Sequence, residues 1–281
     1  MPCTLASGAR LHYPFTLISM IDIPSALEER YGKAHLSYSS LKVALTDMAQ
    51  FDLYMKRKLK FESPALAFGT LYDMLLFERE KAMDTYTIVS DDKILDMCSS
   101  AVRKMKRPTM SGEFKKIKTE MLEQAETEGK TLCSPEDWKM ANDMIDRLEE
   151  CGLADQYLSS GNYQVEFNEQ LGPVRVKGFL DCLGDGYIVD SKSTKSVSKF
   201  RYSVRDFCYD IQAFIYSKVF GVDEFYWLVQ EKTSPYLPAI VECSEETLFS
   251  GEMKFNDAIE RIQNFLTNGK APETDYLRFK V

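Results

Sequence analysis

The sequence predicts an α/β protein whose N-terminal half is largely helical. In that half, apolar residues recur at intervals of three and four, which is the period of a helix with one buried face. Beyond residue 160, short apolar or alternating runs bounded by turn residues indicate strands. The expected order of elements is therefore a helical half followed by β-β-β-α-β-β-α.

The helical half is expected to contain a series of amphipathic helices. The first is capped by Ser39 or Ser40, and the last starts at Ser134, a good N-cap that is followed by proline. Residues 1–35 show no clear period and are expected to form an N-terminal arm. The helical stripes lie at 41–55, 69–79, 94–105, 114–121 and 135–151.

Strands dominate the rest of the chain. The dense apolar run at 225–229 suits a strand that is buried on both faces. A helix at 203–220 ends at Gly221, and a closing helix follows the last strand. The expected strands lie at 163–167, 174–183, 187–191, 225–229 and 236–243, and the closing helix at 245–266.

Composition excludes several classes of protein. With 281 residues, of which 44% are hydrophobic and 28% charged, the chain can bury a sizeable core. No apolar run approaches the roughly 18 residues of a membrane span, and the N-terminus lacks the order of a signal peptide. We therefore expect a cytoplasmic protein without a membrane partner. Seven single cysteines without a CxxC pair, and only two histidines, argue against structural zinc, an iron–sulfur cluster or a His-based hydrolase.

The net charge of −8 hides a local concentration of basic residues. Lysines and arginines cluster at 56–60, 103–107 and 115–118. Each cluster could be a solvated helix face. Together they suggest a positive groove on a negative body, as expected of an enzyme that must bind and release DNA.

The most informative segment contains Gly-Asp-Gly at 184–186, a signal for a hairpin turn. Such a turn makes Asp181 and Asp190 neighbours on antiparallel strands. Lys192 lies two residues after Asp190, so these two side chains share a face, and Ser191 points the other way. The apolar run before Asp190 places the charges where a buried strand emerges.

Two carboxylates and an ammonium at a sheet edge are the groups that metal-assisted phosphodiester hydrolysis needs. Carboxylates hold Mg²⁺ through oxygen, and the metal lowers the pKa of a bound water and stabilises charge on the phosphate. Lys192 can orient that water or offset the developing charge. The alternative is a pair of solvated charges, because Asp-x-Lys occurs by chance in many strands.

This arrangement of Asp181, Asp190 and Lys192 resembles the PD-(D/E)xK nuclease superfamily. The next helix carries Gln212 and Tyr216 one turn apart, similar to the Gln-x-x-x-Tyr signature of the RecB-like branch. The resemblance implies a mixed central β-sheet flanked by helices, in which these two side chains reach a phosphate or the attacking water. The alternative is a core tyrosine beside a capping glutamine.

Two stretches of the helical half, 36–42 and 67–76, resemble the leading motifs of the exonuclease VIII (RecE) group of phage recombination exonucleases. In that group the second motif usually ends in a metal-binding histidine, and here the corresponding residue is Asp73. Aspartate is a competent ligand for Mg²⁺ or Mn²⁺, so the metal preference could differ. The metal ligands that the resemblance implies are Asp73, Asp181, Asp190 and the backbone carbonyl of Ser191.

The resemblance extends to four further residues. Glu166 lies on the strand before Asp181, where related nucleases often carry an acid near the metals, although an exposed strand residue is an equal alternative. Arg30, Ser37 and Ser39 precede or open the first long helix, where related exonucleases are expected to hold a 5′-phosphate. Hydroxyls at a helix N-terminus favour anions, but Ser39 is more simply an N-cap.

We therefore expect a Mg²⁺-dependent 5′→3′ exonuclease that acts on linear double-stranded DNA ends and exposes 3′ single strands for phage-type recombination. The resemblance implies a ring-shaped homo-oligomer, a single-strand annealing protein as partner, and a bacterial or phage-infected cytoplasm. Residues 161–281 would form the nuclease core, and residues 36–160 would contribute to the active-site cleft of one compact domain. The alternatives are an endonuclease or single-strand-specific nuclease on the same core, and a non-catalytic DNA-binding scaffold with a decayed site.

Overall fold

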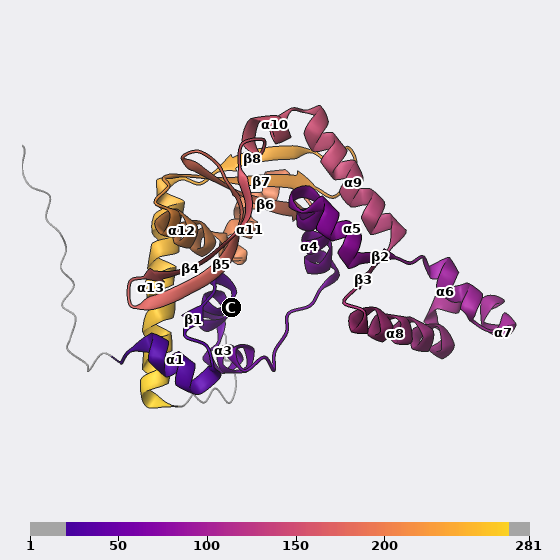
Figure 1. The fold of residues 1–281 in the computed structure, drawn as a ribbon, viewed down its shortest axis with the longest axis horizontal. Helices are drawn as coiled ribbons and strands as arrows, with labels where there is room; N and C mark the ends of the chain where they lie inside the picture. The colour runs from indigo at the N-terminus through magenta and orange to yellow at the C-terminus, as the bar shows by residue number, and fades with distance from the viewer. Residues whose placement is uncertain (1–20, 270–281) are drawn as a thin grey trace, which may run out of the picture.

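The computed structural model describes residues 21–269 (Figure 1). A six-stranded mixed sheet in the order β1-β5-β6-β7-β8, with β4 paired to β5 outside this path, forms its centre. The pairs β1–β5 and β6–β7 are parallel, and the other pairs are antiparallel. The strands are β1 (His35–Leu36), β4 (Asn162–Leu171), β5 (Val174–Leu183), β6 (Tyr187–Thr194), β7 (Glu224–Glu231) and β8 (Pro238–Glu242).

The two edges of β5 are paired differently. Strand β4 pairs with one edge from Val174 to Leu183. The other edge pairs with β1 at residues 175–176 and with β6 at residues 182–183. Within residues 21–269, no strand pairs with this second edge between those two stretches. An opening in the sheet therefore lies beside the middle of β5, at residues 177–181.

Residues 1–20 of the N-terminal arm expected at 1–35 lie outside the described part of the chain, and the rest contains helix α1 (Ile23–Tyr31), for which the sequence shows no clear period. Its hydrophobic pattern is weak, and its main apolar contacts come from Ile23 and Leu27, which are buried in the main core. Packing against the rest of the protein stabilises a helix whose own sequence gives little periodic signal. Figure 1 shows α1 beside the lower end of the long helix α13 (Glu245–Asn268).

The single helix expected at 41–55 is divided into α2 (Tyr38–Thr46) and α3 (Met48–Met55). Asp47 between them has an extended backbone, and its side chain accepts a hydrogen bond from the N–H of Gln50 at 2.8 Å. Asp47 therefore ends one helix and caps the next, which the continuous apolar stripe does not reveal.

The helix expected at 94–105 is divided into α6 (Asp91–Met97) and α7 (Ser100–Arg103), because Ser99 caps a second helix. The other helices of the N-terminal half follow the expected stripes with shifted ends. The helix expected at 69–79 begins earlier, because Ser63 caps it and Pro64 occupies its first position. The elements are α4 (Pro64–Phe77), α5 (Arg79–Thr85), β2 (Tyr86–Ile88), α6 (Asp91–Met97), α7 (Ser100–Arg103), the 3₁₀ helix η1 (Pro108–Met110), α8 (Gly112–Thr127), β3 (Thr131–Cys133), α9 (Pro135–Glu150) and α10 (Leu153–Tyr157).

The helix expected at 203–220 is also divided, into α11 (Phe200–Asp206) and α12 (Tyr209–Phe220), after the short 3₁₀ helix η2 (Val197–Lys199). Cys208 between them has φ +57°, a left-handed conformation that is unusual for a residue with a side chain. A helical stripe in the sequence continues across such a break, because the apolar spacing is nearly unchanged.

Both faces of the sheet are covered. Ile188 of β6 and Trp227 of β7 lie in the main core with α1, α2, α3, α12 and α13. Their neighbours Val189 and Leu228 lie in a second cluster that includes residues of α4, α9 and α10. This alternation is the two-residue period of a strand with both faces buried, and it fixes which side chains meet which layer.

Residues 86–133, which we call the side lobe, extend from the sheet domain (Figure 1). The lobe begins and ends with the parallel strands β2 and β3 and contains α6, α7, η1 and α8. Its own apolar cluster contains Ile94, Val102 and Phe114. Among the helices of residues 21–269, none has both the length and the hydrophobicity needed to cross a membrane.

Candidate active site

The candidate site lies where β5 and β6 diverge. These strands pair at Cys182–Val189 and Leu183–Ile188, and the next opposed positions are Asp181 and Asp190. The N–H of Ser191 donates to Oδ2 of Asp181 at 2.9 Å. A carboxylate thus receives a backbone hydrogen bond at the point where the ladder stops, and the hairpin brings the two acidic residues together as expected.

Asp190 is almost completely buried, with a side chain that is 1% exposed. Its Oδ2 forms an ion pair with Nζ of Lys192, as expected for residues that share a face. Its Oδ1 accepts a hydrogen bond from Nε2 of Gln212 at 2.8 Å. Nζ of Lys192 also donates to the carbonyl of Ser191 at 3.0 Å. Both carboxylate oxygens of Asp190 are therefore held in place.

Gln212 and Tyr216 connect α12 to the opening in the sheet. Nε2 of Gln212 lies 3.3 Å from the hydroxyl of Tyr216, and that hydroxyl donates to the carbonyl of Phe179 at 2.9 Å. Phe179 lies on the stretch of β5 between its pairings with β1 and β6. Tyr216 therefore satisfies a backbone group that the opening leaves without a strand partner.

A buried polar anchor fixes the start of α12. Oδ2 of Asp210 accepts hydrogen bonds from Oγ of Ser250 at 2.8 Å and from Nζ of Lys254 at 2.6 Å, both on α13. A Cβ atom on Gly251 would lie 2.1 Å from the carbonyl oxygen of Asp210, so the helices touch here. Gln212 lies two residues after Asp210 on α12, so this anchor helps to fix the position from which Gln212 reaches Asp190.

Asp73 approaches the same site from α4. Gly69, one turn earlier, lies against Ser193 of β6, since a Cβ atom there would be 4.0 Å from the serine hydroxyl. The neighbouring Tyr72 is fully buried and donates to Oε1 of Gln230 at 2.6 Å. Gln230 in turn donates to backbone carbonyls of residues 144 and 236. This network holds α4 on the sheet. Asp73 lies close enough to the other two aspartates for their charges to raise its pKa.

The charges of the site are unbalanced. Burial raises the pKa of Asp73 well above its ordinary value, and the charge of Asp181 raises it further, whereas Lys192 lowers it. Burial raises the pKa of Asp190 to about 7, against the opposing effect of Lys192. Burial also raises the pKa of Asp181. Three carboxylates thus share one ammonium in a region where unpaired charge is costly.

The donor chemistry fits a hard divalent cation. Within residues 21–269, no three His, Cys, Asp or Glu side chains already surround a position where one ion could be held. Asp73, Asp181 and Asp190 nevertheless offer only oxygen, and with Lys192 they leave two negative charges that a divalent ion would cancel. Oε1 of Gln212 is a buried acceptor without a donor in the described part of the chain. The site is therefore incomplete in charge and in hydrogen bonding.

Glu166 has the exposed strand position that the sequence offered as the equal alternative to a catalytic role. It pairs with Phe179 in the sheet register, its side chain is 54% exposed, and it forms an ion pair with Lys177 at 2.7 Å. Gln164 takes the place opposite Asp181, and its Nε2 lies 3.5 Å from Oδ1 of that residue. The two-residue turn after Leu171 fixes this register, so counting from the turn would have identified Gln164.

Ser37, rather than Ser39 or Ser40, is the N-cap of α2. Its side chain accepts from the N–H of Ser40, and Oγ of Ser40 accepts from the N–H of Ser37 at 2.8 Å. This is a capping box in which both hydroxyls satisfy backbone groups. Ser39 lies within the first turn and is half-buried. Capping explains Ser37, and we do not propose it as a phosphate ligand.

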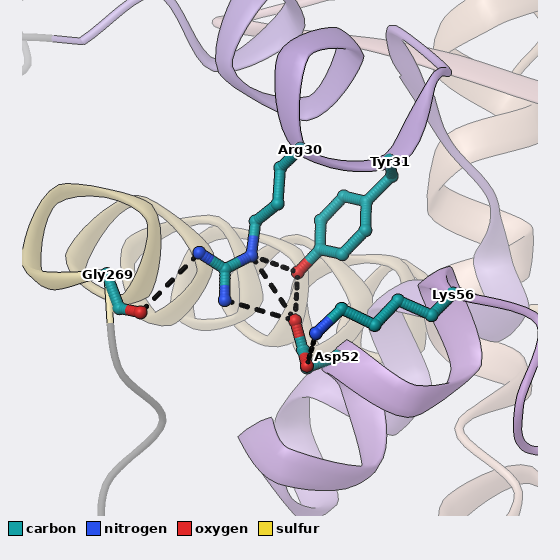
Figure 2. A network of polar contacts seen from close by, with 5 residues as sticks. All are labelled: Arg30, Tyr31, Asp52, Lys56 and Gly269. Atoms are coloured by element: carbon teal, nitrogen blue, oxygen red, sulfur yellow. Dashed lines mark hydrogen bonds and ion pairs between the residues drawn. The ribbon is translucent and has the colours of Figure 1, made fainter.

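Arg30 belongs to a network between helices instead of the site (Figure 2). Its guanidinium donates to Oδ1 of Asp52 at 3.2 Å, to the hydroxyl of Tyr31 and to the carbonyl of Gly269. Tyr31 donates to the same carboxylate at 2.8 Å, and Lys56 forms an ion pair with its other oxygen. The network joins α1, α3 and the end of α13, so Arg30 has a structural role.

Three residues near Lys192 were not identified from the sequence. The ring of Tyr209 lies 5.0 Å from Nζ of Lys192, a distance at which an aromatic ring stabilises a cation. Tyr38 donates its hydroxyl to the carbonyl of Phe207, and Lys42 lies 5.4 Å from the Tyr38 ring. A sequence signal was present, because Tyr38 and Lys42 lie within the motif at 36–42 and Tyr209 lies three residues before Gln212, but it did not single out these side chains.

Comparison with known proteins supports this picture of the fold. Residues 37–278 match the model of a family described as "PDDEXK-like domain of unknown function (DUF3799)". A crystal structure named "Putative exonuclease" from Eubacterium rectale is similar with a TM-score of 0.59 and 18% identity, over 95% of this chain and 97% of that chain. At that identity the likeness shows the fold alone.

A second crystal structure, a phage related exonuclease from Haemophilus somnus 129PT, has a TM-score of 0.32 and 11% identity. The match covers 66% of this chain and 97% of that chain, and it is too weak to carry an argument. A comparison with curated proteins finds no match.

Proposed function

Because the chain belongs to this family of PDDEXK-like domains, we propose that it is a divalent-metal-dependent deoxyribonuclease. Mg²⁺ is the proposed metal, with Mn²⁺ as a substitute, since both prefer the oxygen donors that the site offers. The observation that carries this proposal is the cluster of carboxylates at the divergence of β5 and β6, which has too few cations to neutralise it. In this cluster Asp190 is buried and contacts both Lys192 and Gln212.

In the proposed mechanism, each residue has a separate task. Asp181 and Asp190, with Asp73 from α4, would hold the metal, which lowers the pKa of water and stabilises charge on the phosphate. Lys192 is restrained by Asp190 and the carbonyl of Ser191, so its ammonium can orient the attacking water or offset charge on the phosphate. Gln212 keeps Asp190 in position.

We further propose that the enzyme degrades linear duplex DNA 5′→3′ and leaves 3′ single strands. Support for this finer assignment comes from the leading motifs at 36–42 and 67–76, which resemble those of phage recombination exonucleases. A ring-shaped homo-oligomer and a single-strand annealing partner are proposed on the same ground. Asp73 stands where that group has histidine, so the metal preference is expected to favour all-oxygen coordination.

The test is digestion of linear and covalently closed circular duplex DNA with and without Mg²⁺. Wild-type protein should degrade only the linear form, and Asp190→Asn should abolish degradation. The matched control is Asp185→Asn, which removes an exposed carboxylate from the turn of the same hairpin and should leave activity unchanged. End-labelled DNA then gives the polarity.

Other outcomes separate the alternatives. Cleavage of the closed circle would identify an endonuclease. Absence of any metal-dependent cleavage by folded protein that still binds DNA would contradict the enzymatic proposal and favour a scaffold.

A further inference from the structure

The outer part of the side lobe carries a concentrated positive charge. Between residues 103 and 118 the sequence contains seven lysines or arginines and a single acid, Glu113, in a chain of net charge −8. We call the exposed residues Arg103, Lys104, Lys106 and Arg107 the basic tip. They follow directly on α7, which lies at the outer end of the lobe (Figure 1).

The single acid within this segment, Glu113, is hydrogen-bonded to Ser99 instead of to the basic tip. The two oxygens of Glu113 accept hydrogen bonds from the N–H of Ser99 at 2.6 Å and from its hydroxyl at 2.8 Å, which fastens the start of α8 to the start of α7. Among residues 21–269, no acid forms an ion pair with the four residues of the basic tip. Their charges are therefore uncompensated as well as exposed.

The negative charges of α8 are segregated at its other end. Glu120, Glu123, Glu126 and Glu128 are all exposed, and no lysine or arginine lies among them. This end leads into β3, which pairs with β2 where the lobe joins the rest of the chain. Charge on the lobe is therefore ordered, with the positive end farthest from the sheet domain.

The lobe can hold the tip at a defined place. Its apolar cluster packs α6, α7 and α8 together through Ile94, Val102 and Phe114. The strands β2 and β3 connect it directly to α5 and α9, and α9 packs on α4, which carries Asp73. A helix of 16 residues such as α8 is about 24 Å long, so the tip stands well out from the base.

From these features we propose that the basic tip binds the phosphate backbone of duplex DNA outside the active site. The proposal rests on the nuclease function and adds a second point of contact to it. Four exposed, unpaired cations within five residues, with Met105 the one exposed apolar side chain among them, suit a polyanion better than a folded protein, because charged residues are depleted at the centre of protein interfaces. An acidic body repels DNA, so a remote positive contact also steers it.

The size of the lobe gives the proposal a length scale. Base pairs rise by about 3.4 Å, so the roughly 24 Å of α8 corresponds to about seven base pairs. Duplexes shorter than this cannot reach from the base of the lobe to its tip. The tip should therefore add to the affinity of the base of the lobe only for long duplexes, which can contact both places at once.

The experiment measures binding of the full chain to a duplex of about 40 bp and one of about 6 bp, in EDTA, over a range of salt concentrations. The test variant carries Arg103→Gln, Lys104→Gln, Lys106→Gln and Arg107→Gln. For the long duplex we expect roughly 10–100-fold weaker binding near 0.1 M salt, and a slope of log K against log[salt] that is smaller by about 3.6, at about 0.9 for each of the four cations. The loss of affinity should be smaller for the short duplex, which cannot contact the tip and the base of the lobe together.

A matched control tests whether net charge alone explains the result. Replacing Glu120, Glu123, Glu126 and Glu128 with glutamine changes the net charge by the same amount in the opposite direction. A local contact predicts less than about 3-fold change in affinity for this control, whereas a field of the whole protein predicts a gain comparable to the loss. A second variant, Arg103→Lys with Arg107→Lys, keeps the charge and should keep the affinity.

The outcomes for the tip and for the nuclease are separate. If wild type and the glutamine variant have equal affinity, equal salt slope and matching thermal melts, the basic tip does not contact DNA. The alternative partner for the tip would then be an acidic protein. Wild-type protein that binds DNA through the tip but never cleaves it would overturn the nuclease function and keep the contact.

Discussion

The group around Asp190 and the group around Asp52 are built from the same kinds of side chain and behave in opposite ways. Each has a carboxylate that is held by a cation and linked to a tyrosine. Around Asp52, Arg30 and Lys56 supply two cations to one acid, and each carboxylate oxygen has a partner (Figure 2). In the candidate site, three carboxylates share Lys192, and a buried acceptor of Gln212 lacks a donor.

The comparison teaches that the supply of cations to the carboxylates separates a structural cluster from a functional one. A cluster in which the carboxylate has cations on both oxygens gains stability from its contacts. A buried cluster with more carboxylates than cations costs stability until a further cation binds. Substitutions in the two groups should therefore affect different measurements.

The largest effect is expected from Asp190→Asn. Loss of a metal-holding carboxylate should lower the rate of DNA cleavage by at least about 10³-fold, which corresponds to roughly 4 kcal/mol. The melting temperature should stay close to that of the wild type, because asparagine can still accept from Gln212 and one repelling charge is gone. A large drop in melting temperature would mean that Asp190 mainly stabilises the fold, like Asp52.

The second effect concerns metal binding by the site. Mg²⁺ at about 100 times its dissociation constant should stabilise the wild-type protein by about 2.7 kcal/mol, since it binds the folded state. Asp190→Asn should remove most of this gain, and Asp52→Asn should keep it. Thermal melts at increasing Mg²⁺ measure the difference. An equal gain in all three proteins would mean that the metal binds elsewhere.

The third effect is a loss of stability at Asp52 without loss of activity. Asp52→Asn should cost about 1–2 kcal/mol near neutral pH, after allowance for the partial exposure of Lys56. Burial alone would raise the pKa of Asp52, but hydrogen bonds from Lys56, Tyr31 and Arg30 outweigh it, and the pKa is lowered.

The sign of that shift sets a pH window. A carboxyl with a lowered pKa contributes its full stability above its unfolded pKa of about 3.9, and loses it as the pH falls through the folded pKa. The difference in unfolding free energy between wild type and Asp52→Asn should therefore be constant near neutral pH, at about pH 6–7. It should shrink below about pH 4. A difference that grows in acid would contradict the assignment.

The smallest effect is expected from Tyr31→Phe. This change removes one hydrogen bond to Asp52 at 2.8 Å but leaves both cations in place, so it should cost about 0.5–1.5 kcal/mol. DNA cleavage should be unaffected. A loss of activity here would link the α1–α3 network to the site and weaken the contrast between the two groups. Chemical denaturation with an unchanged m-value is the measurement.

Local sequence determined the hairpin and its neighbours well. The turn at 184–186 was sufficient to pair β5 with β6 and to bring Asp181 and Asp190 together, because a short turn fixes the register. The apolar runs and caps likewise predicted the order of strands from β4 to β8 and the helices between and after them. They missed β1, β2 and β3, which are two or three residues long and too short to show a period.

What could not be predicted depends on contacts between distant segments. The break at Cys208 needs a left-handed residue, and α12 beyond it is anchored through Asp210 to Lys254 on α13. The burial of Asp190 is a similar case. The sequence places its charge where a buried strand emerges, but its almost complete burial depends on contacts with Lys192 and with Gln212 of α12. Alanine would leave both without a partner, whereas asparagine keeps an acceptor for Gln212 and is therefore the better probe.

The side lobe has the form of an insertion that could be removed from the chain or changed in length. It enters the chain through β2 and leaves through β3, and these strands lie side by side, with Tyr86 opposite Thr131. A short linker could replace α6 to α8 without disturbing any strand of the main sheet, because the lobe has its own apolar cluster. The reach of such a domain along a filamentous ligand can therefore lengthen or shorten independently of its catalytic chemistry.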